Sequence, residues 1–560
     1  MTSMGSRTVI IGGVAGGAST AARLRRLDEG AEIIVLEKSG HVSFANCGLP
    51  YHLSGTIAKQ ESLLLQTPQS LYDRLRLDVR VHQEVIEIDR ETKQLVVVDN
   101  AEGGTYSLSY DNLVLSPGGR PMVPDVPGAT RAVHLHTIED LEAVKQRLDD
   151  ATDVVVVGGG FIGLEAAENL VRSDRRVTLL ELADQVLAPL DPEMARPVLE
   201  ELERNGVNVR LRTSVSSIGE EHVVLSDGTE IPAQMVLFAL GVRPNTDLAR
   251  AAGLSLGPNG GIAVSETMKT SDPNIWAVGD AVEKKDLVSG DSALIPLANV
   301  ANRQGRLAAD SIAGRSRPAL PSQGTAIVGV FGLAAAMTGW NEKRLRAAGR
   351  DYLAIHTHPT DHAGYYPAAT GMAIKLLVSP GTGEILGAQI VGRGGVDKRI
   401  DVLATAMRTG LTAPELPDLE LAYAPQFGSA KDPINQLGYV AENRLSGLQR
   451  TVDWSQVGSL IEQGWTVLDV RTPGERRRGS VTGSVNIPVD ELRERLGELD
   501  PQGHYIVHCA VGQRSHIATQ VLTANGFDAV NLDGGYTTLA AGTASQRTTD
   551  GAGVREAVIG

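Results

Sequence analysis

Short apolar runs that end in glycine set the pattern of the first half of the chain. Residues 8–11 read TVII and are followed at once by GGVAGGA and a segment with apolar positions at helical spacing. The same order returns where DVVVV at 153–157 precedes GGGFIGLEAAENL. A few consecutive apolar residues before a glycine turn are typical of a strand buried on both faces. Each segment therefore predicts a strand, a tight turn and a helix.

The other apolar runs are equally short. Residues 154–157 and 235–242 have the length of core strands, whereas a helix that crosses a bilayer needs roughly 18 apolar residues. Residues 8–18 follow Arg7 and resemble the apolar core of a signal peptide, but glycines interrupt them at once, so we interpret them as a strand and a turn. The pattern predicts a protein without a membrane span.

Proline and glycine divide the rest of the chain. Residues 116–129 and 239–245 have the composition of crossover connections, and residues 325–440 mix short strands and helices without a nucleotide signal. Residues 441–454 are the best linker candidate, and a new α/β pattern begins at Trp465. The residues after Ala540 are rich in Ala, Gly, Ser and Thr, which predicts a disordered tail.

The second glycine turn carries a dinucleotide-binding fingerprint. In G-x-G-x-x-G the first glycine makes the turn, the second admits a pyrophosphate, and the third lets the helix pack on the strand. Glu181 follows the next apolar run, where a carboxylate accepts hydrogen bonds from a ribose 2′-hydroxyl. No Arg or Lys lies between Glu181 and Leu190, so NADH is favoured and NADPH stays possible. The residues expected to bind NAD are Gly158, Gly160, Phe161, Ile162, Gly163, Glu181 and Gly241.

The first glycine turn departs from this fingerprint, because Val14 stands where the middle glycine is expected. Taken alone, it is also compatible with a purely structural turn. Two features favour a nucleotide: Glu37 ends the next apolar run, and the apolar stretch within 270–281 runs into Gly279 and Asp280. An aspartate at such a strand end can hold a ribityl hydroxyl of a flavin. Two such units in one chain imply two dinucleotides.

The two turns and the Gly-Asp pair together resemble the two-dinucleotide-binding flavoprotein disulfide reductases over residues 7–445. The resemblance implies FAD at the first turn and NADH at the second. The residues then expected to bind FAD are Gly12, Gly13, Ala15, Gly16, Glu37, Lys38, Asn46, Gly279, Asp280, Pro296, Leu297 and Ala298.

The amino-acid composition argues against some classes of binding partner and of metal or disulfide site. The net charge is −15 and aromatic residues make up 4% of the 560 positions, which argues against nucleic acid and anionic membranes as partners. Only two cysteines occur, Cys47 and Cys509, which excludes a disulfide scaffold and a zinc site with several cysteines. Two isolated thiols suggest a reducing compartment, and we expect the cytoplasm.

Cys47 is the first candidate nucleophile. Members of the reductase family often carry two redox-active cysteines four residues apart, but SFANCGLPY offers one. A single thiol beside a flavin must complete its cycle with a partner from solution, through a mixed disulfide, a persulfide or a sulfenic acid. The stretch SFANCGLPYHLSG resembles the coenzyme A-disulfide reductases and the NADH-dependent persulfide and polysulfide reductases. In that family the cysteine holds coenzyme A as a mixed disulfide.

This closer resemblance implies further catalytic and binding residues. In a homodimer, Tyr365 and Tyr423 would lie beside the cysteine of the other subunit, where phenol hydroxyls stabilise or protonate a leaving thiolate. A lysine position of the family falls on Leu75, with Arg74 or Arg76 as substitutes. The positions that match coenzyme A contacts are Ser19, Arg23, Arg26, Ser43, Asn46, Asn302 and Lys431.

Three histidines precede these tyrosines, at 356, 358 and 362, and could be read as a metal site. Flavin-thiol exchange needs no open metal chemistry, so we interpret the run as a loop that leads to the tyrosines and predict no metal.

Cys509 is the second candidate nucleophile. A strand ends at His508, and the loop from Cys509 closes at Arg514 just before a helix, which turns backbone N–H groups and a helix N-terminus toward the sulfur. Four residues separate the cysteine from the arginine, against five in tyrosine-phosphatase-like enzymes, and the smaller ring suits a persulfide. The segment resembles a rhodanese domain, with Cys509 and Arg514 catalytic. Supporting residues would be Asp469, Arg471 and Gly512. A merely structural rhodanese stays open.

These observations predict an α/β protein with two nested Rossmann-like domains, an α+β dimerisation domain and a C-terminal α/β rhodanese domain. The expected limits are 1–120 and 246–322 for the FAD-binding domain, 121–245 for the NAD(P)H-binding domain and 323–445 for dimerisation. The rhodanese domain would span 446–543, with a disordered tail at 544–560.

The predicted activity is transfer of hydride from NADH through FAD to Cys47, and from there to coenzyme A persulfide, polysulfide or coenzyme A disulfide. Coenzyme A would be bound as a substrate or a mixed disulfide, and the rhodanese domain would transfer sulfur. One alternative is an NADH peroxidase or oxidase that uses Cys47 as a sulfenic acid. Another is a sulfane-sulfur carrier or sensor, in which Cys509 relays sulfur and the flavin half reports redox state.

Overall fold

The computed structural model describes residues 6–549 and 558–559, which form two compact units. The first unit comprises residues up to Leu180 together with Ser214–Gly324, and the second comprises Glu181–Thr213 and the chain from Thr325 onward. None of the helices in the described ranges is long and apolar enough to cross a membrane.

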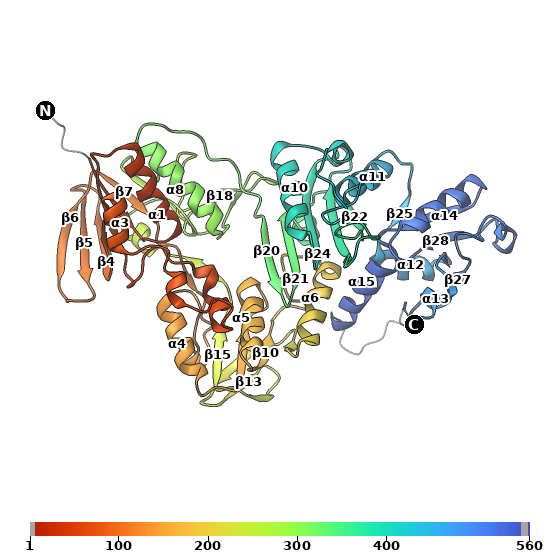
Figure 1. Cartoon of the computed structure of the whole chain (residues 1–560), viewed down its shortest axis with the longest axis horizontal. Helices are drawn as coiled ribbons and strands as arrows, with labels where there is room; N and C mark the ends of the chain where they lie inside the picture. Colours follow the sequence, from red (N-terminus) through yellow and green to blue (C-terminus); the bar gives the residue numbers. More distant parts are fainter. Residues whose placement is uncertain (1–5, 550–557, 560) are drawn as a thin grey trace. The chain divides into compact units, whose positions relative to one another are not determined.

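A five-stranded parallel sheet lies at the centre of the first unit, in the order β17-β7-β1-β2-β3. Helices α1 and α8 pack against each other beside it (Figure 1). Ile10 and Val35 pack toward these helices, and Val9 and Ile34 pack toward an antiparallel sheet, β4-β5-β6. The apolar runs are uninterrupted because both faces of the parallel sheet are buried. The bounds are β1 Arg7–Ile11, α1 Ala15–Leu27, β2 Glu32–Leu36, β3 Asp78–Arg80, β4 Gln83–Asp89, β5 Gln94–Asp99, β6 Thr105–Ser109, β7 Asn112–Leu115, β17 Ile275–Ala277 and α8 Ala298–Ile312.

The second glycine turn belongs to another parallel sheet of the first unit, in which β9 pairs with β10 and β15. The run at 235–242, which has the length of one strand, is divided: β15 ends at Phe238, and Gly241 turns the chain at φ 87°. The bounds here are α2 Leu49–Leu53, α3 Pro68–Leu75, β8 Gly119–Pro121, α4 Ile138–Leu148, β9 Asp153–Val157, α5 Phe161–Arg172, β10 Arg176–Leu180, β12 Val215–Ile218, β13 His222–Leu225, β14 Glu230–Pro232, β15 Met235–Phe238, β16 Val242–Pro244, α7 Asp247–Ala251, β18 Lys284–Lys285 and β19 Ser292–Ala293.

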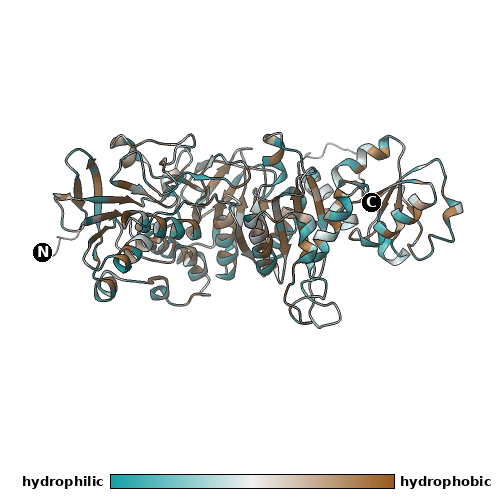
Figure 2. Cartoon of the chain, turned by 90° about the horizontal axis from the view of Figure 1, so that it is seen from above, coloured by the Kyte–Doolittle hydropathy of each residue, from teal (hydrophilic) through white to brown (hydrophobic). Residues whose placement is uncertain are grey.

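The second unit begins with an antiparallel sheet in the order β20-β21-β24-β23-β22. Helices α6 and α10 pack on this sheet, and its central strands are coloured mostly as hydrophobic in Figure 2. The bounds are α6 Pro192–Arg204, β11 Asn208–Arg210, β20 Ala326–Val330, β21 Leu333–Gly339, α9 Glu342–Ala347, β22 Leu353–Thr357, β23 Met372–Val378, β24 Ile385–Gly392, α10 Val396–Thr409 and α11 Pro433–Leu445.

The remainder of the second unit is a parallel five-stranded sheet in the order β25-β29-β28-β26-β27. The expectation of a disordered tail is wrong for residues 544–549, which continue helix α15, and Ile559 bridges Val481. Trp454 packs against Gly542 of this helix, so an apolar contact orders it. Residues 550–557 and 560 lie outside the described ranges. The bounds are β25 Thr451–Val452, α12 Val457–Glu462, β26 Thr466–Asp469, α13 Pro473–Arg476, β27 Val485–Asn486, β28 His504–His508, α14 Gln513–Ala524, β29 Asp528–Leu532 and α15 Gly535–Thr549.

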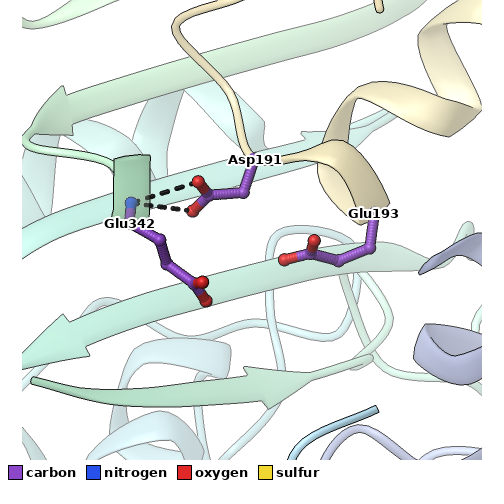
Figure 3. A group of neighbouring side chains, drawn as sticks. All are labelled: Asp191, Glu193 and Glu342. Carbon is purple, nitrogen blue, oxygen red and sulfur yellow. Dashed lines mark hydrogen bonds between the residues drawn. The ribbon is translucent and has the colours of Figure 1, made fainter. Parts of the chain in front are cut away.

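Buried charges join the two sheets of the second unit. Asp191, Glu193 and Glu342 bring three carboxylates together, a grouping that resembles a cation site (Figure 3). Lys375 occupies this position, because its Nζ lies 2.9 Å from Asp191 and 2.6 Å from Glu342 and also contacts Glu193. His356 connects the group to the C-terminal sheet. Its Nε2 lies 3.1 Å from Glu193 and its Nδ1 lies 2.6 Å from Asp533 at the end of β29.

Candidate active site

The first glycine turn forms a cradle at the N-terminus of α1. Gly12 has φ 95°, and a Cβ there would lie 2.1 Å from the carbonyl oxygen of Ser116. Val14 is the N-cap residue of α1 and makes no side-chain capping bond, so the helix end stays available to an anion. The buried Glu37 accepts the N–H of Gly13 at 2.8 Å and of Ser39 at 2.9 Å. The turn therefore fits a dinucleotide although its middle glycine is missing.

Gly279 and Asp280 follow β17 at the same end of the sheet. Burial raises the pKa of Asp280. Two residues that the sequence reasoning missed hold this segment. Gln304 of α8 accepts the N–H of Gly279 at 2.9 Å, and Lys284 donates to the carbonyl oxygens of Gly279 and Val282 at 2.8 Å each. Burial lowers the pKa of Lys284 to about 8. Leu297, the last residue before α8, is its N-cap, also without a side-chain capping bond.

The second glycine turn has the same construction at α5, which begins at Phe161 and Ile162. A Cβ atom added at Gly158 would lie 2.4 Å from the carbonyl oxygen of Ala239. A Cβ atom added at Gly163 would lie 1.8 Å from the carbonyl oxygen of Gly158. At Gly160, the N-cap, and at Gly241 no atom lies within 4 Å of such a Cβ. Because α5 has no side-chain cap and open space at Gly160, the turn fits a pyrophosphate. Glu181 directly follows β10 and accepts the N–H of Ala183 at 2.8 Å.

Cys47 lies in a short 3₁₀ turn, Asn46–Gly48, directly before α2. Its side chain is exposed, and the thiol is 3.7 Å from the side-chain oxygen of Asn46. Partial burial of the sulfur and the negative charges of Glu165 and Asp280 raise the pKa of Cys47. Glu165 lies on α5 and Asp280 follows β17, so charged groups beside both glycine turns act on the thiol. Sequence reasoning missed Glu165, because its position follows from packing between α2 and α5.

Several positions matched to coenzyme A contacts lie where α1 meets α8. Ser19 donates to Asn302 at 2.7 Å, which brings two of them together. Arg23 is paired with Asp310 at 2.7 Å, a partner that the sequence did not indicate, and Arg26 is exposed. Ser43 lies on the loop before Cys47 with φ 50°. The carbonyl oxygen of Leu75 accepts a bond from Arg25.

The structure places Tyr365 and Tyr423 together in the second unit. Their hydroxyl oxygens are 2.8 Å apart, and the side chains are 76% and 48% exposed. This hydrogen bond raises the pKa of Tyr365. Lys431 lies over the ring of Tyr439 at 6.0 Å.

The three histidines before these tyrosines have different partners. His356 is held by Asp533 and Glu193, the Nε2 of His358 lies 2.7 Å from the Thr538 hydroxyl, and the Nε2 of His362 lies 3.1 Å from the Pro367 carbonyl. His356 belongs to strand β22, so the interpretation of the run as a loop is wrong for its first histidine, whereas His358 and His362 follow the strand.

Cys509 is buried, and two hydrogen-bond donors face its sulfur. Its sulfur accepts the N–H of Gly512 at 3.1 Å and the hydroxyl of Ser515 at 3.5 Å. Gly512, with φ 97°, is the N-cap of α14, so Arg514 lies within the first turn of that helix and not before it. The first turn then adds Ser515 to the site, which sequence reasoning missed.

Charged side chains brace this loop. Asp469 holds Arg471 through two bonds of 2.9 and 2.8 Å, and Arg471 lies 4.2 Å from the centre of the Tyr536 ring. Arg514 donates two hydrogen bonds, of 2.8 and 2.5 Å, to the carboxylate of Glu475, and this ion pair lowers the pKa of Glu475 to about 2. Glu475 and Tyr536 were not predicted, since both reach the loop from separate elements.

Three family models match the chain. Residues 6–305 match the pyridine nucleotide-disulphide oxidoreductases, residues 325–432 match the dimerisation domain of that family, and residues 453–541 match a rhodanese-like domain. A coenzyme A disulfide reductase from Staphylococcus aureus (strain bovine RF122 / ET3-1) is 33% identical over 439 residues, which is 78% of this chain and 100% of that protein.

Two solved structures are similar over nearly the whole chain. The reduced Bacillus anthracis CoADR-RHD has a TM-score of 0.95 and 43% identity, covering 96% of this chain and 98% of its own. An NAD-dependent persulfide reductase from A. fulgidus has a TM-score of 0.89 and 37% identity, covering 95% and 99%. These matches confirm the predicted fold class, with its two-nucleotide, dimerisation and rhodanese parts.

Proposed function

Because the chain belongs to the pyridine nucleotide-disulphide oxidoreductase family, whose members use FAD and NAD(P)H, we propose that it is an NADH-oxidising reductase of coenzyme A persulfide, polysulfide or coenzyme A disulfide. Cys47 is its single redox cysteine. The observation that carries this proposal is the position of Cys47. Its thiol is exposed, and the negative charges of Asp280, which follows β17, and of Glu165, on α5, both act on it.

The redox step needs one thiolate and one sulfane sulfur. The Cys47 thiolate attacks the outer sulfur of coenzyme A persulfide, forms a new S–S bond and releases the coenzyme A thiolate. Two electrons and one proton then cleave the Cys47 hydropersulfide to the Cys47 thiolate and hydrogen sulfide. With coenzyme A disulfide the adduct is a Cys47–coenzyme A mixed disulfide. FAD held at the first turn, beside Glu37, would supply the electron pair that this reduction needs.

The binding residues follow the cradles described above. We propose that the backbone and Glu37 at the first turn hold FAD, and that Glu181, with no cation before Leu190, selects NADH over NADPH. The positions Ser19, Arg23, Arg26, Ser43, Asn46, Asn302 and Lys431 are proposed to bind coenzyme A. Two free cysteines favour a reducing compartment, the cytoplasm.

A second copy of the chain completes the site in this proposal. Tyr365, Tyr423 and Phe427 expose large aromatic surfaces on the second unit, with Phe427 67% exposed. Exposed aromatic groups of this kind are enriched at interfaces. The hydroxyl of Tyr365 or Tyr423 would protonate the thiolate that leaves at the partner's cysteine.

The rhodanese-like domain would supply sulfur to the reductase site. We propose that Cys509 accepts a sulfane sulfur, because the N–H of Gly512 and the hydroxyl of Ser515 point at its sulfur and stabilise a thiolate or persulfide anion. The proposed domain limits remain 1–120 with 246–322, 121–245, 323–445 and 446–543.

The test is anaerobic NADH oxidation with coenzyme A persulfide, coenzyme A disulfide and hydrogen peroxide offered separately. Faster turnover of either sulfur substrate than of peroxide supports the proposal, and fastest turnover of peroxide would establish the peroxidase alternative. Slow turnover of all three, together with a stable Cys509 persulfide that passes to a protein partner, would establish the carrier.

A further inference from the structure

Two histidines of the dimerisation domain hold a segment of the rhodanese-like domain. The N–H of His356 donates to Asp533 at 3.0 Å, and its Nδ1 lies 2.6 Å from the same carboxylate. The Nε2 of His358 lies 2.7 Å from the hydroxyl oxygen of Thr538. The two histidines therefore fix both ends of residues 533–538, which we name the bridging segment.

The bridging segment in turn supports the Cys509 loop. The N–H of Tyr536 donates to the carbonyl oxygen of Cys509, and the N–H of Thr537 donates to that of Ala510, both at 2.9 Å. A Cβ atom added at Gly535 would lie 2.8 Å from the carbonyl oxygen of Cys509. Because the two backbones pack this closely, the loop cannot shift independently of the bridging segment.

Gly534 of the bridging segment comes close to both His356 and Gly512. A Cβ atom added at Gly534 would lie 2.7 Å from the Cβ of His356, and one added at Gly512 would lie 3.6 Å from the nitrogen of Gly534. The N–H of Gly512 is the group that donates to the Cys509 sulfur at 3.1 Å. A displacement of the bridging segment would therefore move this donor.

Sulfur transfer depends on where the donors of the loop point. The Cys509 thiolate attacks the outer sulfur of a donor such as thiosulfate, a new S–S bond forms, and sulfite leaves. Cyanide then takes the outer sulfur as thiocyanate and restores the thiolate. The N–H of Gly512 and the hydroxyl of Ser515 stabilise this anionic sulfur only while they face it.

We propose that His356 and His358 are positioning residues of the sulfur-transfer site, which hold the bridging segment where it supports the Cys509 loop. Neither histidine touches the sulfur. Cys509 is then fully active only in a chain whose dimerisation domain contacts the bridging segment. This inference rests on the proposed function of Cys509.

The test is steady-state sulfur transfer from thiosulfate to cyanide by full-length His358→Ala, Thr538→Val and the double variant. Each single substitution removes the same contact, so each is expected to lower kcat about tenfold and to leave the KM for thiosulfate nearly unchanged. The double variant should lose no more than either single one, because both act through one contact. His358→Gln, whose amide reaches about as far as the imidazole Nε2, should recover most of the rate.

Ser545→Ala is the matched control. The hydroxyl of Ser545 on α15 lies 3.1 Å from the carbonyl oxygen of Pro192 on α6, so this variant removes a contact of the same helix outside the bridging segment. An unchanged rate in Ser545→Ala supports the proposal. Equal losses in Ser545→Ala and His358→Ala, losses that multiply in the double variant, or an unchanged kcat in His358→Ala would overturn it.

Hydrogen exchange separates this inference from the proposed function, because it needs no sulfur substrate. The amides of Gly512, Tyr536 and Thr537 should exchange faster in His358→Ala than in Ser545→Ala. Equal exchange in the two variants would overturn the inference even where sulfur is transferred. An unsubstituted protein that transfers no sulfur would refute the proposed function of Cys509, and the exchange result would still decide whether the histidines position the loop.

Discussion

Asp533→Asn is expected to destabilise the second unit strongly, because it removes one partner of a buried ion pair. His356 lies between Asp533 and Glu193 with a side chain that is 1% exposed, and that of Asp533 is 5% exposed. Although burial alone would lower the pKa of His356, its hydrogen bonds to Asp533 and Glu193 raise it to about 10. The imidazolium is therefore the native form at neutral pH.

The magnitude follows from that shift. A rise from 6.5 to about 10 corresponds to roughly 5 kcal/mol at 1.36 kcal/mol per unit, an upper bound shared between two carboxylates. Breaking a buried pair typically costs 3–5 kcal/mol. Glu193 stays in place at 3.1 Å and still pairs with the imidazolium. The expected loss in Asp533→Asn is therefore about 3 kcal/mol.

The pH dependence has a definite sign. A group whose pKa is raised in the folded state contributes its full stability below pH 6.5 and loses it as the pH rises through about 10. The free energy of unfolding of the unsubstituted protein should fall between these values, and the slope should be smaller in Asp533→Asn. Urea unfolding followed by tryptophan fluorescence measures both quantities, since Trp454 packs on α15 just beyond Asp533.

Asp528→Asn is the matched control. Asp528 pairs with His504 and with Arg450, each at 2.6 Å, but the three side chains are 34%, 54% and 63% exposed. A solvent-exposed pair contributes about 0.2–1 kcal/mol. Equal losses in the two variants, or an unchanged pH slope in Asp533→Asn, would refute the reasoning that burial makes the His356 pair strong.

Three further substitutions test the two candidate sites. Gly160→Ala adds a Cβ into open space, so thermal unfolding should stay unchanged while calorimetry shows NADH binding weakened at least about tenfold; unchanged affinity would contradict the cradle. Gly163→Ala forces a Cβ against the Gly158 oxygen and should destabilise the protein by about 1–3 kcal/mol, and unchanged thermal unfolding would contradict this packing. Glu475→Gln keeps the capping bond of α13 but replaces the ion pair with Arg514 by a weaker hydrogen bond. Arg514 is then freer to bind an anionic sulfur donor, so sulfur transfer from thiosulfate to cyanide should become severalfold faster. An unchanged rate would contradict the reasoning that Glu475 restrains Arg514.

The sequence predicted those parts of the molecule that depend on local steric and hydrogen-bond rules. Gly158 and Gly163 are recognisable because any side chain there would strike backbone, and the strand before them is apolar because both of its faces are covered. The Cys509 loop is likewise encoded locally, since Gly512 supplies the positive φ that lets its N–H face the sulfur.

Contacts between segments that are far apart in the sequence could not be predicted from these local rules. Glu165 and Tyr51 meet only because α2 packs on α5, and Glu475 reaches Arg514 from another element, α13. The tail composition suggested disorder, but α15 continues through residues 544–549, and Trp454 packs against this helix at Gly542. The start of α14 at Gln513, one residue before Arg514, was missed because helix ends are poorly encoded in sequence.

The central claim is that Cys47 is the one cysteine that passes electrons to sulfur. The most direct test is the anaerobic rate of NADH oxidation with free coenzyme A persulfide in the unsubstituted protein, Cys47→Ser and Cys509→Ser. We expect Cys47→Ser to lose turnover with bound FAD retained, and Cys509→Ser to keep the rate with the free persulfide. Full activity of Cys47→Ser would contradict the account.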